Sequence, residues 1–346
     1  MSGGVAEPQP ESDAAGPDAA ASVDVTVVIP TLNGERYLAE VLDAIAEQDF
    51  EGVVETLVID SGSTDATLEI VRARPAVRLH EIPNAEFGHG RTRNLGARLA
   101  RGRIIVFLTQ DATPAASDWL RQLVAPLDEP GVEAVVGRQI PRPHAFPLQR
   151  YDIERVFAAQ GPTDAPTIVE AAGRSGDALD DAAFYSDVNS ATHRAFLLET
   201  IPLRDLPYSE DYAFARDVLE AGYRKAYAPG GAVWHSNDVG VHEYAARMFD
   251  ETLGLRRLGL PAPRVSRVGS LLRAVKWSLV DSVRIVRDPA YSLGGRLRWL
   301  AVNPAYHFAR WNGLYHGGRV DLADHAAIAR RSWERHQQRV IRSRGA

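Results

Sequence analysis

The chain has 346 residues, 45% of them apolar, which suffices for one large globular domain with an appendage. It contains no cysteine, and this excludes disulfides, thiolate metal sites and cysteine nucleophiles. The net charge of −6 hides an asymmetry, because sixteen basic and five acidic residues lie from residue 264 onward, against 23 basic and 40 acidic residues before it. A basic C-terminal region on an acidic body favours an anionic partner surface, lipid rather than nucleic acid.

Residues 1–24 are rich in Ala, Gly, Pro, Asp and Glu and contain no Lys or Arg. This composition predicts a disordered lead and is unlike a secretory signal. No apolar run approaches the roughly 18 residues that cross a bilayer. We therefore expect a cytoplasmic protein, free or peripheral on the inner face of the membrane, with a catalytic domain over 25–255 and a basic helical region over 256–346.

The first predicted strand, Val25–Ile29, is apolar and β-branched, and it runs into a polar turn. We expect Pro30 to end the strand, Asn33 and Gly34 to turn the chain, and a helix to follow over 35–47. In a parallel α/β sheet, ligands bind where strands end and helices begin.

The second predicted strand, 54–59, repeats this arrangement and leaves Asp60 at the edge of the sheet with a free carboxylate. Ser63 or Thr64 would cap the next helix, 65–73, with Asp65 in its first turn. Each turn alone is typical of ordinary helix capping. Strand and helix patterns then continue to alternate, which predicts a mostly parallel sheet covered on both faces. The further strands are expected at 77–81, 103–108 and 132–137, and the further helices at 90–100 and 117–124.

The two turns together resemble the opening of family 2 glycosyltransferases, which are inverting enzymes of the GT-A fold. The matching residues run from Ile29 to Glu35 and from Asp60 to Asp65, and the resemblance extends over roughly 25–235. In that family these turns hold the base and ribose of a nucleotide-sugar. The resemblance implies this donor-binding role for Pro30, Thr31, Asn33, Glu35 and Asp60.

The segment Phe87–Gly96 brings two glycines, His89 and two arginines to the start of a helix, an arrangement suited to an anion. It lacks the third glycine of a dinucleotide fingerprint, so a dehydrogenase is disfavoured. The family resemblance implies that Arg93 and Asn94 support the donor diphosphate. His89 is as readily a structural histidine as a ligand contact.

A third strand end, after 104–108, carries Thr109, Gln110 and Asp111. Asp111 stands where the last Asp of the family's Asp-x-Asp motif would be, while Thr109 replaces the first Asp. The resemblance implies that Gln110 and Asp111 bind the donor and that Asp111 holds Mg²⁺ or Mn²⁺ with the diphosphate. Asp111 as a plain helix cap is the alternative. The Thr-Gln-Asp variant resembles rhamnosyltransferase-like members, which favours dTDP-rhamnose over a UDP-sugar as donor.

Two acids, Glu210 and Asp211, open a predicted amphipathic helix, where they could simply complement the helix dipole. In family 2 such a pair supplies the base that deprotonates the acceptor hydroxyl, usually the Asp, so we expect Asp211 to act as base beside Glu210. Further along, His235 matches a family histidine that approaches the metal. A histidine bonded to the backbone is the alternative, and Trp234 is expected in the core.

Apolar residues recur at helical spacing from Val268 to Val286, with Arg and Lys on other faces. This pattern predicts an amphipathic helix that packs on the catalytic body or on a second subunit, or that docks on anionic lipid. Trp277, Trp299 and Trp311 would suit a headgroup layer.

Overall, the sequence predicts an inverting GT-A glycosyltransferase that moves a hexosyl group, such as rhamnosyl, from a nucleoside diphosphate to a saccharide or lipid-linked saccharide. Homo-oligomerisation stays open, and nucleic acid is not expected as a partner. Two other classes remain. A nucleotidyltransferase shares the fold but needs no base at Asp211, and a non-catalytic module would bind nucleotide or glycan for another enzyme.

Overall fold

The computed structural model describes residues 22–237, 239–260 and 262–333, so most of the predicted lead lies outside the described residues. Within them, nine strands form one sheet in the spatial order β3-β2-β1-β4-β8-β6-β9-β5, and β7 pairs with β9. The strands are β1 (Val25–Thr31), β2 (Val54–Asp60), β3 (Val77–Glu81), β4 (Ile104–Leu108), β5 (Thr113–Pro114), β6 (Val132–Ile140), β7 (Thr167–Val169), β8 (Asn189–His193) and β9 (Arg224–Trp234).

The first four sheet positions, β3-β2-β1-β4, are parallel throughout, as the alternating pattern predicts. Side chains alternate between two cores, so Val27 and Ile29 of β1 join one and Val28 joins the other. Helices α1 (Leu38–Ala46), α2 (Thr67–Arg72) and α4 (Trp119–Val124) contribute to the first core, while α3 (His89–Leu99), α7 (Arg194–Glu199) and α8 (Glu210–Glu220) contribute to the second. The sheet is therefore covered on both faces.

One expectation about β1 is wrong. The strand does not end at Pro30, since Pro30 pairs with Ile59 and Thr31 with Asp60 in the parallel ladder. A proline lacks only one ladder donor, and at the end of a strand this loss is tolerated. The two strands consequently end in register, which places the turns that follow them side by side.

The second half of the sheet is built around β8, which runs antiparallel to both β4 and β6. The stretch 161–181 contains β7 and the start of α6 (Asp177–Ala182). Two short 3₁₀ helices, η1 (Asn84–Glu86) and η2 (Ala125–Asp128), follow β3 and α4.

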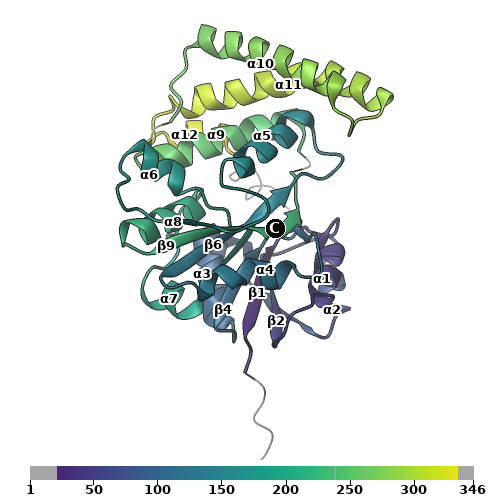
Figure 1. The fold of residues 1–346 in the computed structure, drawn as a ribbon. Coiled ribbons are helices and arrows are strands. Elements are labelled where there is room, and N and C mark those ends of the chain that lie inside the picture. The colour runs from purple at the N-terminus through teal and green to yellow at the C-terminus, as the bar shows by residue number, and fades with distance from the viewer. Residues whose placement is uncertain (1–21, 238, 261, 334–346) are drawn as a thin grey trace, which may run out of the picture.

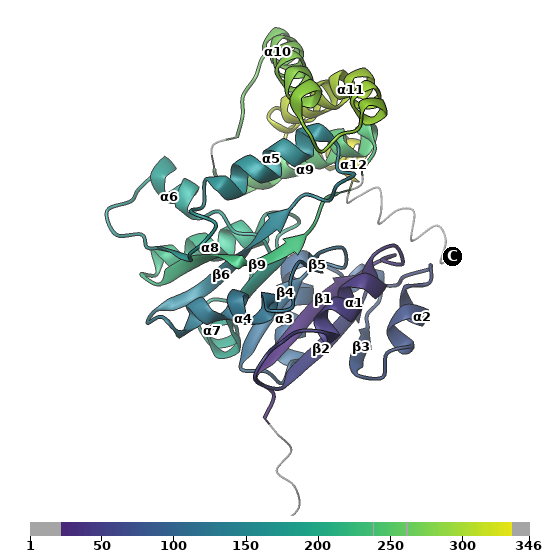
Figure 2. The same cartoon turned by 45° about the vertical axis from the view of Figure 1, so that its right-hand side comes forward.

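A helical layer covers one end of the molecule. It consists of α5 (Pro147–Ala158), α9 (Val241–Arg257), α10 (Arg267–Arg287), α11 (Leu293–Gly317) and α12 (His325–Arg331). Figures 1 and 2 show α5 and α9 between the sheet and the α10–α11 hairpin, which lies at the end of the molecule farthest from the start of β1. The predicted boundary at residue 255 falls inside α9, and the division into domains stays a prediction. Among the described residues, no helix combines the length and apolarity needed to span a membrane.

Candidate active site

The turns that follow β1 and β2 form one hydrogen-bonded unit. Asn33, with a left-handed φ of 50°, accepts through Oδ1 from the backbone N–H of Thr64 at 2.8 Å. Glu35 Oε2 accepts from the N–H of Ala66 at 3.0 Å. Ser63 does not cap the helix as expected, because its Oγ accepts from the N–H of Asn33 at 2.8 Å. The side chains predicted to bind the donor therefore also fix the shape of the turns.

Asp60 does not present a free carboxylate, contrary to expectation. It is 1% exposed, and its two oxygens accept hydrogen bonds from the hydroxyls of Thr31 and Ser63 and from the N–H groups of Gly62 and Ser63, at 2.5–3.0 Å. The chain turns back on itself directly after β2, which aims these donors at the carboxylate. Asp60 and Thr31 thus hold together the turn that follows β2, and direct contact with a nucleotide stays a prediction.

Gln110 joins the end of β4 to the turn after β1. Its Oε1 accepts from the N–H of Leu32 at 2.8 Å, and its Nε2 donates to the carbonyl of Leu32 at 3.0 Å. A Cβ placed on Gly34 would lie 2.7 Å from Gln110 Oε1, so this bridge requires glycine there. The predicted donor-binding residue Gln110 therefore sets Asp111 beside the first two turns.

Asp111 and His235 lie together although 124 positions separate them. His235 Nε2 is 3.6 Å from Asp111 Oδ2, and His235 Nδ1 is 2.9 Å from Gln139 Oε1. An amide oxygen can only accept, so Nδ1 carries the hydrogen that bonds Gln139, and Nε2 faces Asp111. Burial would raise the pKa of Asp111, but the adjacent His235 outweighs it and lowers that pKa to about 2. Asp111 is therefore an anion at neutral pH.

This pair fits a divalent cation. Two ligand atoms that each lie about 2.1 Å from one ion can be up to about 4.2 Å apart, and the separation of 3.6 Å is within that limit. No group of three or more His, Cys, Asp or Glu side chains suited to a metal occurs in the described part of the chain. An ion at Asp111 and His235 would therefore need oxygen ligands from a bound diphosphate or from water. Trp234, expected in the core, is 37% exposed beside this pair.

Glu210 and Asp211 open α8, directly after Ser209, whose φ of 66° is left-handed. Arg93 binds the first of them. Its Nη1 donates to Glu210 Oε1 at 2.8 Å, and its Nε lies 3.3 Å from Asp187 Oδ2. All three side chains are buried. The guanidinium of Arg93, expected at the donor diphosphate, is therefore held by carboxylates and fixes the start of α8.

Asn94 also departs from its expected role. Its Nδ2 donates to the carbonyl of Leu203 at 2.7 Å, and its Oδ1 accepts from the N–H of the same residue at 3.2 Å. Both ends of the amide are thus engaged by backbone. Asn94 ties α3 to the segment that leads into α8, and its contact with the donor stays a prediction. The ring of His89 packs edge-on against Phe87, with centroids 5.1 Å apart.

Asp211 is half-buried, and its carboxylate accepts from the N–H of Asp187 at 3.3 Å and of Tyr212 at 2.7 Å. Burial raises the pKa of Asp211 to about 8, and the nearby carboxylates of Glu210 and Asp187 add to the rise, while Arg93 opposes it. A carboxylate tuned toward neutral pH is suited to accept a proton in catalysis.

Residues 186–188 lie between the candidate metal ligands, Asp111 and His235, and the two acids at the start of α8, Glu210 and Asp211. The carbonyl of Val188 accepts from the N–H of Thr109 at 3.1 Å, while the N–H of the preceding residue, Asp187, donates to Asp211. Ser186 Oγ lies 3.2 Å from Gln139 Nε2, which orients the partner of the histidine. One short segment thus links Thr109, near Asp111, with Asp211.

Asp187 and Gln139 were missing from the residues predicted from sequence. Asp187 lies just before β8, a strand that the pattern of apolar residues in the sequence does not predict. Once β8 is placed beside β4, a carboxylate just before it must lie near the end of β4. A correct prediction of β8 would therefore have identified Asp187 as a candidate site residue.

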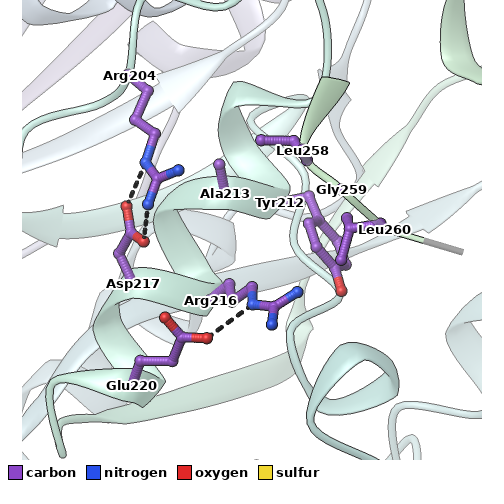
Figure 3. A pocket seen from close by; sticks show the side chains of 9 residues that line it. All are labelled: Arg204, Tyr212, Ala213, Arg216, Asp217, Glu220, Leu258, Gly259 and Leu260. Atoms are coloured by element: carbon purple, nitrogen blue, oxygen red, sulfur yellow. Dashed lines mark hydrogen bonds and ion pairs between the residues drawn. The ribbon is translucent and has the colours of Figure 1, made fainter. Parts of the chain in front are cut away.

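A separate cavity of about 250 Å³ lies on another face of α8. Figure 3 shows that its two arginines are both paired, Arg204 with Asp217 and Arg216 with Glu220. Its lining contains none of the predicted site residues. These arginines are therefore not available to replace Arg93 at a diphosphate.

Comparison with known proteins agrees with this geometry. The family model for glycosyl transferase family 2 matches residues 26–178. The O-antigen chain rhamnosyltransferase RfbN of Salmonella typhimurium is 32% identical over 229 residues, which span 65% of this chain and 70% of that protein. The O-antigen chain rhamnosyltransferase WbaN of Salmonella anatum is 28% identical over a stretch of the same length.

Solved structures show the same fold. The mannosyltransferase PcManGT of Pyrobaculum calidifontis, in complex with GDP-Man and Mn²⁺, is similar with a TM-score of 0.51 at 22% identity, over 94% of this chain and 86% of that one. Residues 1–349 of S. aureus TarS give a TM-score of 0.50 at 18% identity, over 89% and 78%. The predicted GT-A fold is confirmed. The chain belongs to glycosyltransferase family 2.

Proposed function

We propose that the protein transfers a rhamnosyl group, with inversion, from dTDP-rhamnose or a related nucleoside-diphosphate sugar to a saccharide hydroxyl, carried free or on a lipid. The observation that carries this proposal is the contact of residues 186–188 with both sides of the site. It sets an anionic metal-binding pair, Asp111 and His235, near a carboxylate with a raised pKa, Asp211. The rhamnosyl donor is supported by the names of the two Salmonella relatives.

In the proposed reaction, Asp211 takes the proton of the acceptor hydroxyl as the acceptor oxygen bonds to the anomeric carbon. The bond from that carbon to the diphosphate oxygen breaks, and the nucleoside diphosphate leaves with the bonding electrons. Arg93 holds Glu210 and thereby the first turn of α8, on which Asp211 stands. The turns around Asn33 and Asp60 would hold the nucleoside.

The divalent cation, Mg²⁺ or Mn²⁺, would be held by Asp111 and His235 and would offset the negative charge that develops on the diphosphate. Asp111 suits this role because its pKa of about 2 leaves it ionised at neutral pH, so protons do not compete with the cation for it. Gln139 and Ser186 keep the imidazole in the orientation that presents Nε2.

The test is turnover with a panel of dTDP-rhamnose, UDP-glucose, UDP-N-acetylglucosamine and GDP-mannose, with and without Mn²⁺. We expect metal-dependent release of dTDP from dTDP-rhamnose, and the largest thermal stabilisation with the same nucleotide-sugar. Formation of pyrophosphate would identify a nucleotidyltransferase instead. Binding of a nucleotide-sugar without any hydrolysis or transfer would identify a non-catalytic module.

A further inference from the structure

Helix α10 packs on the protein through a narrow face of small and polar residues. Ala274, Ser278, Asp281 and Ile285 are buried, and they follow one another at intervals of three or four residues. Asp281 Oδ2 lies 3.0 Å from the buried His307 Nε2 of α11. The buried face of α10 thus combines Ala274 and Ile285 with polar side chains, and the other large apolar side chains of this helix lie elsewhere.

The apolar stripe of α10 points outward, which overturns the expectation that it packs on the catalytic body. Seven aliphatic side chains are between 44% and 66% exposed. At 3.6 residues per turn they occupy an arc of roughly 120°, beside the buried arc and distinct from it. We call this arc the α10 outer face; it consists of Val268, Leu271, Leu272, Val275, Leu279, Val283 and Val286.

The charges on the exposed surface of α10 have one sign. All of its basic residues are exposed, while its only acid, Asp281, is buried. Trp277 is 40% exposed. The basic residues are Arg267, Arg273, Lys276, Arg284 and Arg287.

The apolar surface continues beyond α10. The first turns of α11 expose Leu293 and Leu297 by 74% and 63%. A groove of about 350 Å³ between α10 and α11 is lined by Leu271 of the outer face together with Phe308 and Trp311. Exposed apolar side chains in this number mark a surface that meets a partner and is shielded from water there.

We propose that the α10 outer face docks on a membrane surface that contains anionic phospholipid. An apolar stripe with Lys276 and Arg287 beside it has the chemistry that inserts at the boundary between headgroups and acyl chains. A second copy of the chain fits less well, since two such faces in contact would bring like charges together. The hairpin occupies the end of the molecule opposite the start of β1, and none of the described helices and strands lies beyond it (Figures 1 and 2).

This docking surface would bring the enzyme to a lipid-linked acceptor, but the inference itself does not depend on the proposed reaction. It is tested by co-sedimentation of the full chain with vesicles of phosphatidylglycerol and phosphatidylcholine, against phosphatidylcholine alone, at low and high salt. We expect binding to the anionic vesicles at low salt and at least tenfold weaker binding in the other conditions, because each basic residue near such a surface contributes about fivefold.

Two double variants separate the apolar and the charged contributions. Leu272→Ser with Leu279→Ser, and Arg273→Glu with Lys276→Glu, should each weaken vesicle binding at least tenfold. All four side chains are exposed, so the melting temperature should not fall. The matched control, Ile168→Ser on β7, removes an apolar side chain that is 37% exposed elsewhere, and it should bind as the wild type does.

Wild-type protein that stays in the supernatant with anionic vesicles at low salt would overturn the proposal. So would a wild-type dimer, measured by light scattering, that the serine variant converts to a monomer. Hydrolysis of the soluble donor is measured in the same samples. The variants should lose vesicle binding and keep the wild-type rate of donor hydrolysis. Wild-type protein that hydrolyses the donor but does not bind vesicles would refute the docking surface and leave the proposed reaction standing.

Discussion

Replacement of Arg93 by Met tests how the start of α8 is held. Arg93, Glu210 and Asp187 are 6%, 5% and 2% exposed, so the change removes the cation from two buried carboxylates. Loss of one partner of a buried ion pair costs about 3–5 kcal/mol of unfolding free energy. The control is Arg91→Met on the same helix, where Arg91 pairs at 3.4 Å with an exposed Asp205 and the loss should be about 0–1 kcal/mol.

The cost at Arg93 should depend on pH. Burial raises the pKa of Glu210 and of Asp211 above their values in the unfolded chain, and Arg93 limits both rises. Without Arg93 both pKa values rise further. A carboxyl group whose pKa is raised by folding stabilises the fold below its unfolded pKa, and this stabilisation is lost as the pH rises through the folded pKa.

Urea unfolding of wild type, Arg93→Met and Arg91→Met at pH 5.5 and pH 8.5 measures this effect. We expect the destabilisation of Arg93→Met to be clearly larger at pH 8.5, and that of Arg91→Met to be small at both values. Equal losses for Arg93→Met at the two pH values, or a loss no larger than the control, would refute the reasoning that a buried acid cluster surrounds this guanidinium.

Three further changes test other parts of the site. Glu210→Gln removes a negative charge beside the proposed base, so the acid limb of the transfer rate should move to lower pH; an unmoved limb would contradict this. Gln139→Ala removes the partner that orients the imidazole of His235, the proposed metal ligand. The Mn²⁺ concentration for half-maximal activity should therefore rise about 10–100-fold, and an unchanged metal titration would disprove that role. Gly34→Ala would force a Cβ to within 2.7 Å of Gln110 and should weaken donor binding in calorimetry, whereas Gly294→Ala, which meets nothing within 4 Å, should not.

The sequence predicted the parallel part of the sheet well, because β-branched runs such as 25–29 and 104–108 are buried on both faces and carry strong strand propensity. Family resemblance then identified Asp111 and His235, which the structure brings to 3.6 Å. Periodicity could not reveal whether Asp60 keeps a free carboxylate, since that depends on the direction of the backbone N–H groups in the turn that follows it.

Local sequence patterns could not predict which residues pair with Arg93 either. Glu210 lies 117 positions from Arg93 along the chain. Asp187 reaches Arg93 because β8, which it directly precedes, enters the sheet antiparallel to β4. For α10, the spacing of apolar residues predicted an amphipathic helix but not which face meets the protein. The small residues Ala274 and Ser278, one turn apart, marked the packing face and could have been read as such.

The role of Asp211 is tested most directly by Asp211→Asn, with transfer and donor affinity measured on the same preparation. Asn keeps the size of the side chain and one of its two accepting oxygens but cannot take the proton of the acceptor hydroxyl. We expect loss of transfer by at least 10²-fold, with the Kd for the nucleotide-sugar in the presence of Mn²⁺ changed by less than about threefold. Full turnover in this variant, or loss of donor binding in proportion to activity, would show that Asp211 is not the base.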